Sequence, residues 1–324
     1  MNVEFYKPVQ EKLLKARECY YEYASSLKAP LNELAIKYAK PKSKTILPGG
    51  LLGEFVAFWC GEPFHLKDGV LQEASLGCIT GCTYFILEDN WIDDPSKSNP
   101  NTHLLGNLLF TKMVECFFSV SQANYKFWKY LHKYLEEFAE GCMWEQKEHR
   151  NHPKSFTNKD FVMAAKRSAP INICISSLAL AAGREDIIQT LIEAIRQLII
   201  GLQIRDDLAD WKEDIKRGMF TYPLSLALKQ LQNQDNFINA DFTKMNFNDI
   251  KNSLLLSDIA ETTIEKSNAC LKKAKEITSE LDMSLLYLYI DFILEENEEI
   301  KEAIISQKVN YITNTRNIEV LNSL

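Results

Sequence analysis

Three aspartates spaced four residues apart are the part of the sequence best suited to chemistry. Asp206, Asp210 and Asp214 lie in the stretch QIRDDLADWKED, and on a helix of about 3.6 residues per turn this spacing predicts that they share one face. Like charges on one face repel unless a cation lies between them. Carboxylates suit Mg²⁺, which commonly binds one or two of them together with waters and substrate phosphates. The spacing therefore predicts a magnesium and phosphate site, and a solvated acidic face is the alternative.

A second acidic cluster ends another apolar helix. The pattern predicts a helix over 70–94 that stops before Pro95, and its last turns carry Asp89, Asp93 and Asp94. If the two acidic helix ends face each other across a bundle, they would hold several Mg²⁺ ions above an apolar cavity. Such a site suits a ligand with a diphosphate head and a hydrocarbon tail.

The elements that must position these acids are predicted to be helices throughout. Apolar residues recur at three- and four-residue spacing, and no convincing alternating strand pattern is present. We predict helices over 2–40 (a pair), 51–59, 70–94, 103–121, 124–149, 159–180 with a break at Pro170, 185–215, 225–231 and 250–307 (two). No linker or repeat divides the chain. The sequence therefore predicts one all-α domain over 1–324, with a core over 49–307 and a polar tail over 308–324.

Composition limits the classes of partner. The 324 residues carry a net charge of -7 without a dominant Lys/Arg stripe, so we expect no nucleic-acid surface. We find no signal peptide and no run of about 18 apolar residues, so we expect a cytoplasmic protein without membrane insertion. The 8 cysteines are scattered and form no CxxC pair, which favours reduced buried thiols.

The order of the motifs resembles that of the trans-isoprenyl diphosphate synthases. Residues 203–210 (QIRDDLAD) resemble the family's second aspartate-rich motif, QxxDDxxD, and residues 89–93 (DNWID) resemble the first, DDxxD, with Asn in its second position. GCMWE at 141–145 is similar to GQxxD, RSA at 167–169 to KTA, and residues 214–223 to DxxxGKxTxP. The resemblance covers roughly 49–223. It implies an isoprenoid-synthase helical bundle with a central apolar cavity, three Mg²⁺ ions bound with diphosphate, a C10 to C20 prenyl diphosphate substrate and a homodimer.

The candidate site residues follow from the motifs and the resemblance together. We assign five spaced aspartates as metal ligands: Asp89, Asp93, Asp206, Asp210 and Asp214. The neighbouring Asp94 and Asp207 are assigned as further ligands. As diphosphate-binding cations we assign Arg167, Lys166, Lys216 and Arg217. The four acids Asp89, Asp93, Asp206 and Asp210, together with Arg167, form the predicted catalytic set. Aromatic residues near the first motif are assigned to the hydrocarbon pocket: Tyr84, Phe85, Phe58 and Trp91.

Departures from the family pattern concentrate on the co-substrate site. The family's GGKRxRP appears here as GGLLGE at 49–54, without its cations, and its late lysine is replaced by Met219. Such losses resemble the isoprenyl-diphosphate-synthase-like terpene synthases. The sequence therefore predicts a Mg²⁺-dependent terpene synthase, a diphosphate lyase that ionises an allylic prenyl diphosphate and cyclises or quenches the carbocation. There are two alternatives: a short-chain isoprenyl diphosphate synthase, which is a prenyltransferase, with an unusual co-substrate site, and a non-catalytic synthase subunit.

Overall fold

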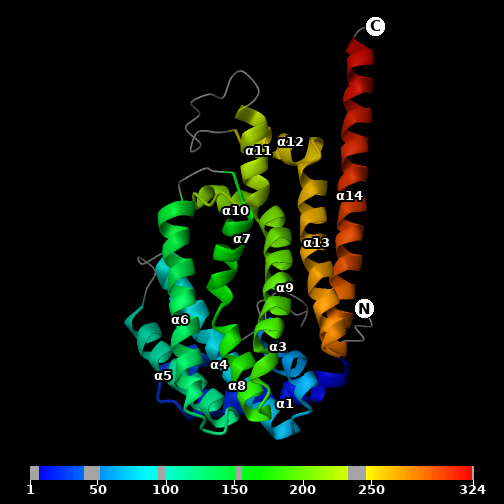
Figure 1. The fold of residues 1–324 in the computed structure, drawn as a ribbon. Coiled ribbons are helices and arrows are strands. Elements are labelled where there is room, and N and C mark those ends of the chain that lie inside the picture. The colour runs from blue at the N-terminus through cyan, green and yellow to red at the C-terminus, as the bar shows by residue number, and fades with distance from the viewer. Residues whose placement is uncertain (1–6, 40–51, 94–98, 151–154, 233–245, 323–324) are drawn as a thin grey trace. The chain divides into compact units, whose positions relative to one another are not determined.

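The chain is a succession of helices (Figure 1). The structure, a computed structural model, describes residues 7–39, 52–93, 99–150, 155–232 and 246–322. Within these ranges, extended pairing outside the helices is limited to an isolated antiparallel bridge between Arg150 and Met219. The all-α prediction is confirmed.

The α-helices have the following bounds: α1 Lys7–Ser26, α2 Leu31–Ala39, α3 Leu52–Gly61, α4 Asp68–Asp93, α5 Pro100–Val120, α6 Lys126–Trp144, α7 Asn158–Ala165, α8 Ile171–Ala182, α9 Ile188–Ala209, α10 Trp211–Lys216, α11 Tyr222–Gln232, α12 Phe247–Leu256, α13 Ile259–Glu280 and α14 Ser284–Asn322. Short 3₁₀ or π turns lie between them: η1 Glu62–Phe64, η3 Glu145–His149, η4 Lys166–Ser168 and η5 Glu185–Ile187. The predicted break at Pro170 is confirmed, because α7 ends at Ala165 and α8 begins directly after that proline.

Internal contacts divide the chain into two compact units. Unit 1 comprises Met1–Phe138, Ser168–Ala194 and Glu276–Tyr289, and unit 2 comprises Ala139–Arg167, Ile195–Lys275 and Ile290–Leu324. The first acidic motif belongs to unit 1 and the second to unit 2. That the chain is one domain with its core over 49–307 stays a prediction.

In unit 1 the helix of the first acidic motif is packed closely on its neighbours. α4 contacts α1, α3 and α5, and its glycines allow α5 to approach. A Cβ at Gly77 would lie 2.8 Å from a ring atom of Phe117, and one at Gly81 would lie 2.7 Å from the sulfur of Met113.

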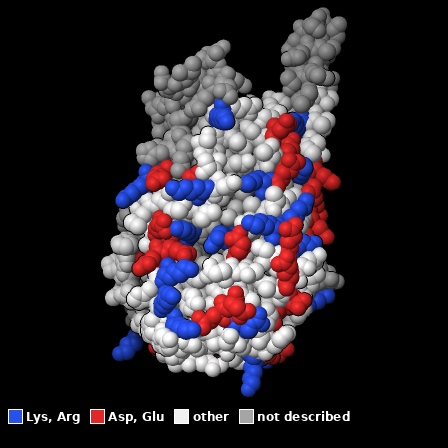
Figure 2. All heavy atoms as spheres, in the orientation of Figure 1, with Lys and Arg blue, Asp and Glu red and all other residues white. Residues whose placement is uncertain are grey.

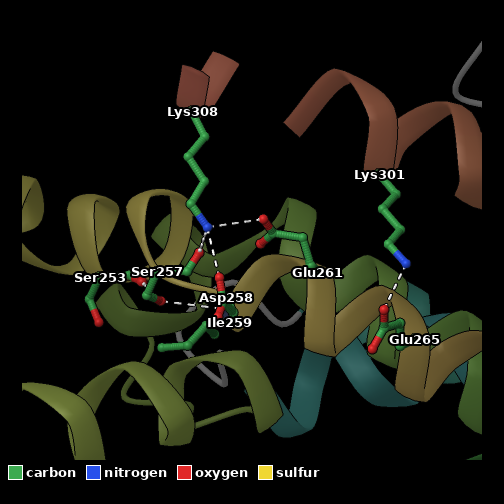
Figure 3. Close-up of polar contacts among 8 residues, drawn as sticks. All are labelled: Ser253, Ser257, Asp258, Ile259, Glu261, Glu265, Lys301 and Lys308. Atoms are coloured by element: carbon green, nitrogen blue, oxygen red, sulfur yellow. Dashed lines mark hydrogen bonds and ion pairs between the residues drawn. The ribbon is translucent and has the colours of Figure 1, made fainter. Parts of the chain in front are cut away.

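In unit 2 two apolar clusters support the second acidic motif. Ile200 and Ile204, in the carboxyl-terminal half of α9, pack in one cluster with Phe161 and Cys270. Trp211 at the start of α10 packs with residues of α11 and α12. Along the other side of this unit α14 is tied to α13 by Lys301 and Lys308 (Figure 3). These contacts hold the helices on which the candidate site is built.

Two sequence expectations are corrected by the helix boundaries. Residues 308–324 were expected to form a polar tail, but α14 continues as a helix to Asn322. The reason is local, since residues 308–322 contain neither proline nor glycine, the two residues that most strongly disfavour a helix. The segment 250–307, expected to form two helices, contributes to three, because Ser257 and the turn near Asp282 divide it.

Two helices are long and apolar enough to cross a bilayer by length and composition, over Asp68–Ile92 and Glu185–Ala209. No such apolar run was expected from the sequence. Of the apolar stretch in each helix, 61% and 50% respectively is buried inside the protein. A long apolar helix with buried sides is typical of the core of a helical protein.

Candidate functional site

The second acidic motif lies at a bend between two helices. α9 ends at Ala209, Asp210 has φ −98° and ψ 11°, and α10 begins at Trp211. The prediction of a continuous helix over 185–215 is therefore wrong at Asp210. The spacing survives the bend, because the amide of Asp210 donates to the carbonyl of Asp206 at 2.8 Å and that of Asp214 to the carbonyl of Asp210 at 3.0 Å. The three acids thus remain on successive turns.

Burial and mutual repulsion perturb the acid at the far end of the stripe. Partial burial and, after it, the charge of Asp210 raise the pKa of Asp214 to about 7, while the nearby Arg217 acts to lower it. Among the described residues no three His, Cys, Asp or Glu side chains converge closely enough to hold a metal together. The donor set still fits Mg²⁺, which takes only one or two carboxylates and completes its shell with waters and phosphate oxygens.

Asp207 points into the protein. Its residue is 6% exposed, and its carboxylate accepts a hydrogen bond of 2.9 Å from Nε2 of Gln203, one turn earlier on α9. Burial raises its pKa well above the ordinary value for aspartate. The predicted role of Asp207 as a further metal ligand stays a prediction, and its observed partner is the amide of Gln203.

The turn after Asp214 is closed by a glycine. Gly218 has φ +69°, a conformation that glycine adopts at little cost, and the amide of Met219 then donates to the carbonyl of Asp214 at 2.8 Å. This pattern is the Schellman type of helix ending. It directs the chain into the bridge with Arg150. Lys216 and Arg217, two predicted diphosphate cations, are both exposed on this turn.

The other two predicted cations of unit 2 are already paired with acids. Arg167 Nη1 contacts Oε2 of Glu145, which is 5% exposed, and Lys166 Nζ lies 2.5 Å from Oε2 of Glu140. Gly141 makes this arrangement possible, because a Cβ there would lie 2.9 Å from the backbone nitrogen of Arg167. The segments that resemble GQxxD and KTA are therefore in contact.

Glu145 also has a partner that the sequence analysis missed. Nη2 of Arg150 lies 3.5 Å from Oε1 of Glu145. A spacing of five residues is not a helical neighbour spacing, so only the π-type turn of η3 brings the two side chains together. The π turn leaves no mark in the hydrophobic pattern, which explains why Arg150 was not predicted.

The first acidic motif occupies the end of α4 in unit 1. Asp89 is half-buried, Asp93 is the last residue of the helix, and Asp94 lies outside the described residues. Between the acids, Trp91 is 43% exposed and its ring meets that of His103 edge-on at 4.4 Å. Trp91 thus lies at the surface of unit 1 and contacts the start of α5. Its predicted place in the hydrocarbon pocket stays a prediction.

Aromatic residues gather about one turn before the first motif. Tyr84 lies 4.8 Å from Phe85 and 5.1 Å from Phe110 between ring centroids, and Phe85 lies 4.9 Å from Phe138. Burial raises the pKa of Tyr84 to about 12. Phe58, also assigned to the pocket, is 2% exposed on α3 and forms part of the core. The cluster around Tyr84 and Phe85 provides an apolar wall in unit 1.

A buried ion pair lies where the resembling family has a cation. Glu54, near the start of α3, is 2% exposed and accepts hydrogen bonds of 2.8 Å from Nε and 2.6 Å from Nη2 of Arg17. The preceding residues 49–51 lie outside the described residues. The carboxylate of Glu54 is thus neutralised by α1.

One pocket lies elsewhere in unit 2. It has a volume of about 450 Å³ and is lined by residues of α11, α12 and the turn after α12 (Gln230, Leu231, Asp249, Asn252, Ser253, Leu256 and Ser257). None of the predicted site residues lines it.

Comparison with solved structures identifies the fold. A decaprenyl diphosphate synthase from Rhodobacter capsulatus matches with a TM-score of 0.73 and 15% identity, over 90% of this chain and 98% of that one. A geranylgeranyl pyrophosphate synthetase from the archaeon Geoglobus acetivorans matches with a TM-score of 0.65 and 20% identity, over 89% and 98%. The chain has the all-α fold of the isoprenyl diphosphate synthases. No protein-family model and no curated protein matches the sequence.

The isoprenyl diphosphate synthase fold agrees with the resemblance inferred from the motifs. A third match is a polyprenyl synthase from Caulobacter crescentus complexed with calcium and isoprenyl diphosphate, with a TM-score of 0.71 and 14% identity over 90% of this chain and 96% of that one. These similar structures are named as synthases that make or bind prenyl diphosphates.

Proposed function

We propose that this protein is a Mg²⁺-dependent isoprenyl diphosphate synthase, which ionises an allylic prenyl diphosphate and joins the allyl group to isopentenyl diphosphate. The observation that carries the proposal is the fold, shared over 90% of this chain and 98% of a decaprenyl diphosphate synthase. Both acidic motifs support it, because each comes at or near the end of an apolar helix. The sequence alone favoured a terpene synthase and gave the isoprenyl diphosphate synthase as the alternative.

The chemistry would be carried by the acids at the end of α4 and around the bend between α9 and α10, together with Arg167 of η4. Asp89 and Asp93 on one motif, with Asp206, Asp210 and Asp214 on the other, would hold about three Mg²⁺ ions, whose charge neutralises diphosphate as it leaves. Arg167 would donate to diphosphate oxygens, a task for which a planar guanidinium is well suited. The allylic carbon–oxygen bond breaks, and the diphosphate keeps the electron pair.

The aromatic wall would protect the cation that remains. Tyr84 and Phe85 lie one turn before Asp89, and an aromatic face stabilises a nearby cation by about 0.5 to 2 kcal/mol. Exclusion of water from this wall would prevent capture of the cation before it reacts. In the synthase reaction the double bond of isopentenyl diphosphate attacks the cation and a proton is then lost.

A terpene synthase remains the second candidate, and one observation favours it. Glu54 stands within the segment where the family carries cations for the co-substrate diphosphate, and its buried carboxylate is held by Arg17 at 2.6 Å. A negative residue fixed in this way cannot bind a second diphosphate directly. A protein that lost this site would cyclise or quench the cation and not extend it.

A product assay separates the two candidates. The full-length protein with Mg²⁺ is supplied with C10, C15 or C20 allylic diphosphate, with and without isopentenyl diphosphate. A longer diphosphate that forms only with the co-substrate supports the synthase, whereas a hydrocarbon or alcohol made without it supports the terpene synthase. Asp206→Ala should lower turnover at least about a hundredfold, and Glu213→Gln, at an exposed position of α10, should not. Absence of turnover with every substrate would contradict both candidates and favour a non-catalytic subunit.

The remaining expectations about partners belong to this proposal. The net charge of -7 supports the absence of a nucleic-acid partner, as does the interspersion of Lys and Arg with Asp and Glu on the face drawn in Figure 2. We also propose a cytoplasmic homodimer without membrane insertion.

A further inference from the structure

An ion pair in unit 2 joins α14 to the residue that precedes Asp206. Nη1 of Arg205 on α9 lies 2.9 Å from Oε2 of Glu296 on α14, and each side chain is 22% exposed. Both of these atoms are withdrawn from solvent. A guanidinium keeps its charge throughout the physiological pH range. The pair therefore holds a permanent positive charge close to a predicted metal ligand.

The charge of Arg205 acts on Asp206. Burial raises the pKa of Asp206, and the positive charge of Arg205 acts to lower it. A guanidinium that is close enough to act on this carboxylate also repels a divalent cation bound to it, and it can itself pair with the carboxylate. Glu296 offers Arg205 an opposite charge in a partly desolvated setting, where pairing is stronger than in water. It therefore weakens the competition between Arg205 and a metal ion for Asp206.

A buried polar network fixes α14 relative to α9. Asn297, the residue after Glu296, is fully buried and donates to Oγ of Ser267 on α13 at 3.2 Å. Ser267 in turn donates to the carbonyl of Gly201 on α9 at 2.7 Å. A Cβ at Gly201 would lie 3.2 Å from the carbonyl oxygen of Ser267, so the glycine lets α13 come this close. The network thus sets the position along α9 at which Glu296 meets Arg205.

We propose that Glu296 is a positioning residue, which engages the guanidinium of Arg205 so that the carboxylate of Asp206 stays available to Mg²⁺. The inference rests on the proposed function for its metal, and it adds to the site a residue of α14, which lies outside both acidic motifs. When the charge of Glu296 is removed, the guanidinium of Arg205 pairs with Asp206 and competes with the metal ion. Glu296 thus influences the reaction without touching the substrate.

The test measures metal binding by the full-length protein, with Mn²⁺ in place of Mg²⁺ and the free Mn²⁺ followed by electron paramagnetic resonance. Sites that Asp206→Ala removes are assigned to the second acidic motif. Glu296→Gln keeps the shape of the side chain and removes its charge, so it should weaken Mn²⁺ affinity at these sites about tenfold. Adding Arg205→Met to Glu296→Gln should restore the affinity to within about twofold of wild type, because the competing cation is then gone.

Asp291→Asn is the matched control. Asp291 is another acid of α14, and it pairs with Lys275 of α13 at side-chain exposures of 35% and 26% respectively. Its substitution should lower the melting temperature to a degree comparable with Glu296→Gln, because each removes a partly buried ion pair of α14. The Mn²⁺ affinity of Asp291→Asn should equal that of wild type.

Three results would overturn the inference. If Glu296→Gln binds Mn²⁺ as wild type does, the pair with Arg205 has no effect on Asp206. If Glu296→Gln binds weakly and Arg205→Met restores nothing, Glu296 acts through packing alone. If Asp206→Ala removes no Mn²⁺ site, the inference falls together with the metal assignment. Because metal binding needs no turnover, a wild type that binds Mn²⁺ at Asp206 and converts no prenyl substrate would defeat the proposed function and leave this inference standing.

Discussion

Asp214 lies in an environment that differs from that of a surface carboxyl. Its pKa of about 7 lies above the usual 3.8 because of burial and the nearby Asp210. Since the folded-state pKa is raised, the folded protein keeps a proton that the unfolded chain releases. The free energy of unfolding of the metal-free protein should therefore be highest near pH 4 and fall as pH rises to about 7.

This pH dependence can be measured by urea unfolding between pH 4 and 8 in a chelator. We expect a loss on the order of 2 kcal/mol, less than the full linkage value because Asp214 is partly exposed. Asp214→Asn should flatten the curve, and Mg²⁺ should stabilise the wild type most above pH 7, where the carboxylate is ionised. An equal slope in wild type and Asp214→Asn would contradict the assignment.

At the scale of single residues, the sequence predicted which aspartates lie on successive turns better than it predicted the direction in which each side chain points. The four-residue spacing placed Asp206, Asp210 and Asp214 on successive turns, and the hydrogen bonds confirm it. The direction of Asp207 could not be predicted, since adjacent residues differ by about 100° around a helix and either could face the interior. Arg150 was missed because its contact depends on a π turn and a bridge to a residue far away in the sequence.

Among the elements, the contact between the end of α6 and η4 depends on one glycine. Gly141→Ala would bring a Cβ within 2.9 Å of the backbone nitrogen of Arg167 and 3.1 Å of the carbonyl carbon of Lys166. Backbone atoms cannot move aside as a flexible side chain would. We expect a loss of about 1 to 3 kcal/mol in unfolding free energy and a raised KM for the diphosphate substrate.

A matched control for this substitution lies in unit 1. Gly69, in the first turn of α4, has nothing within 4 Å of the position that a Cβ would occupy. Gly69→Ala should be neutral or stabilise by up to about 1 kcal/mol, the difference in helix propensity. The two variants can be compared by thermal melting, and equal effects would argue against close packing at Gly141.

The C-terminal helix offers a second comparison between matched residues. Lys308 Nζ donates to the carbonyl of Ser257 at 3.0 Å and pairs with Asp258 at 2.8 Å and Glu261 at 3.2 Å (Figure 3). Lys301 pairs with Glu265 at 2.7 Å, and the side chain of Glu265 is 60% exposed. Lys308→Met should lower the unfolding free energy by about 1 to 2 kcal/mol, and Lys301→Met by less than about 1 kcal/mol.

Hydrogen exchange would locate the effect. In Lys308→Met, exchange should speed up in α14 after residue 301 and at the start of α13, but not in α4 or α5. A uniform increase along the chain would instead mean that Lys308 contributes to global stability and does not fasten this helix locally.

Two element boundaries lie at residues that disfavour a continuing helix. Pro170 separates α7 from α8 and Gly183, with φ +66°, ends α8. The bend at Asp210 has no such residue, so periodicity alone extended the helix to 215. The full length of α14 was missed because a polar segment was taken for a tail, whereas Lys308 fastens it to α13.

For the whole molecule, fold and activity are supported by different observations. The helical fold follows from spacing repeated along the whole chain, so a few substitutions do not obscure it. The choice between one substrate and two depends on the few residues around Glu54 and Met219, where this chain departs from the family pattern. Similarity to a solved structure at 15% identity establishes the fold. The product assay is needed to decide whether the protein uses one substrate or two.

The predicted homodimer can be tested at two exposed apolar residues of α5. Leu104 and Leu108 on α5 are 56% and 38% exposed, and their four-residue spacing puts them on one face. Apolar residues grouped at a surface favour burial against another protein, and we expect a second copy of this chain to cover them.

Light scattering should then give twice the 37.3 kDa of one chain. Leu104→Lys with Leu108→Lys should yield monomers, since charges buried at the contact would lack partners, whereas Tyr125→Lys, at a residue 80% exposed, should remain dimeric. A monomeric wild type, or a double variant that stays dimeric, would show that α5 does not form the interface.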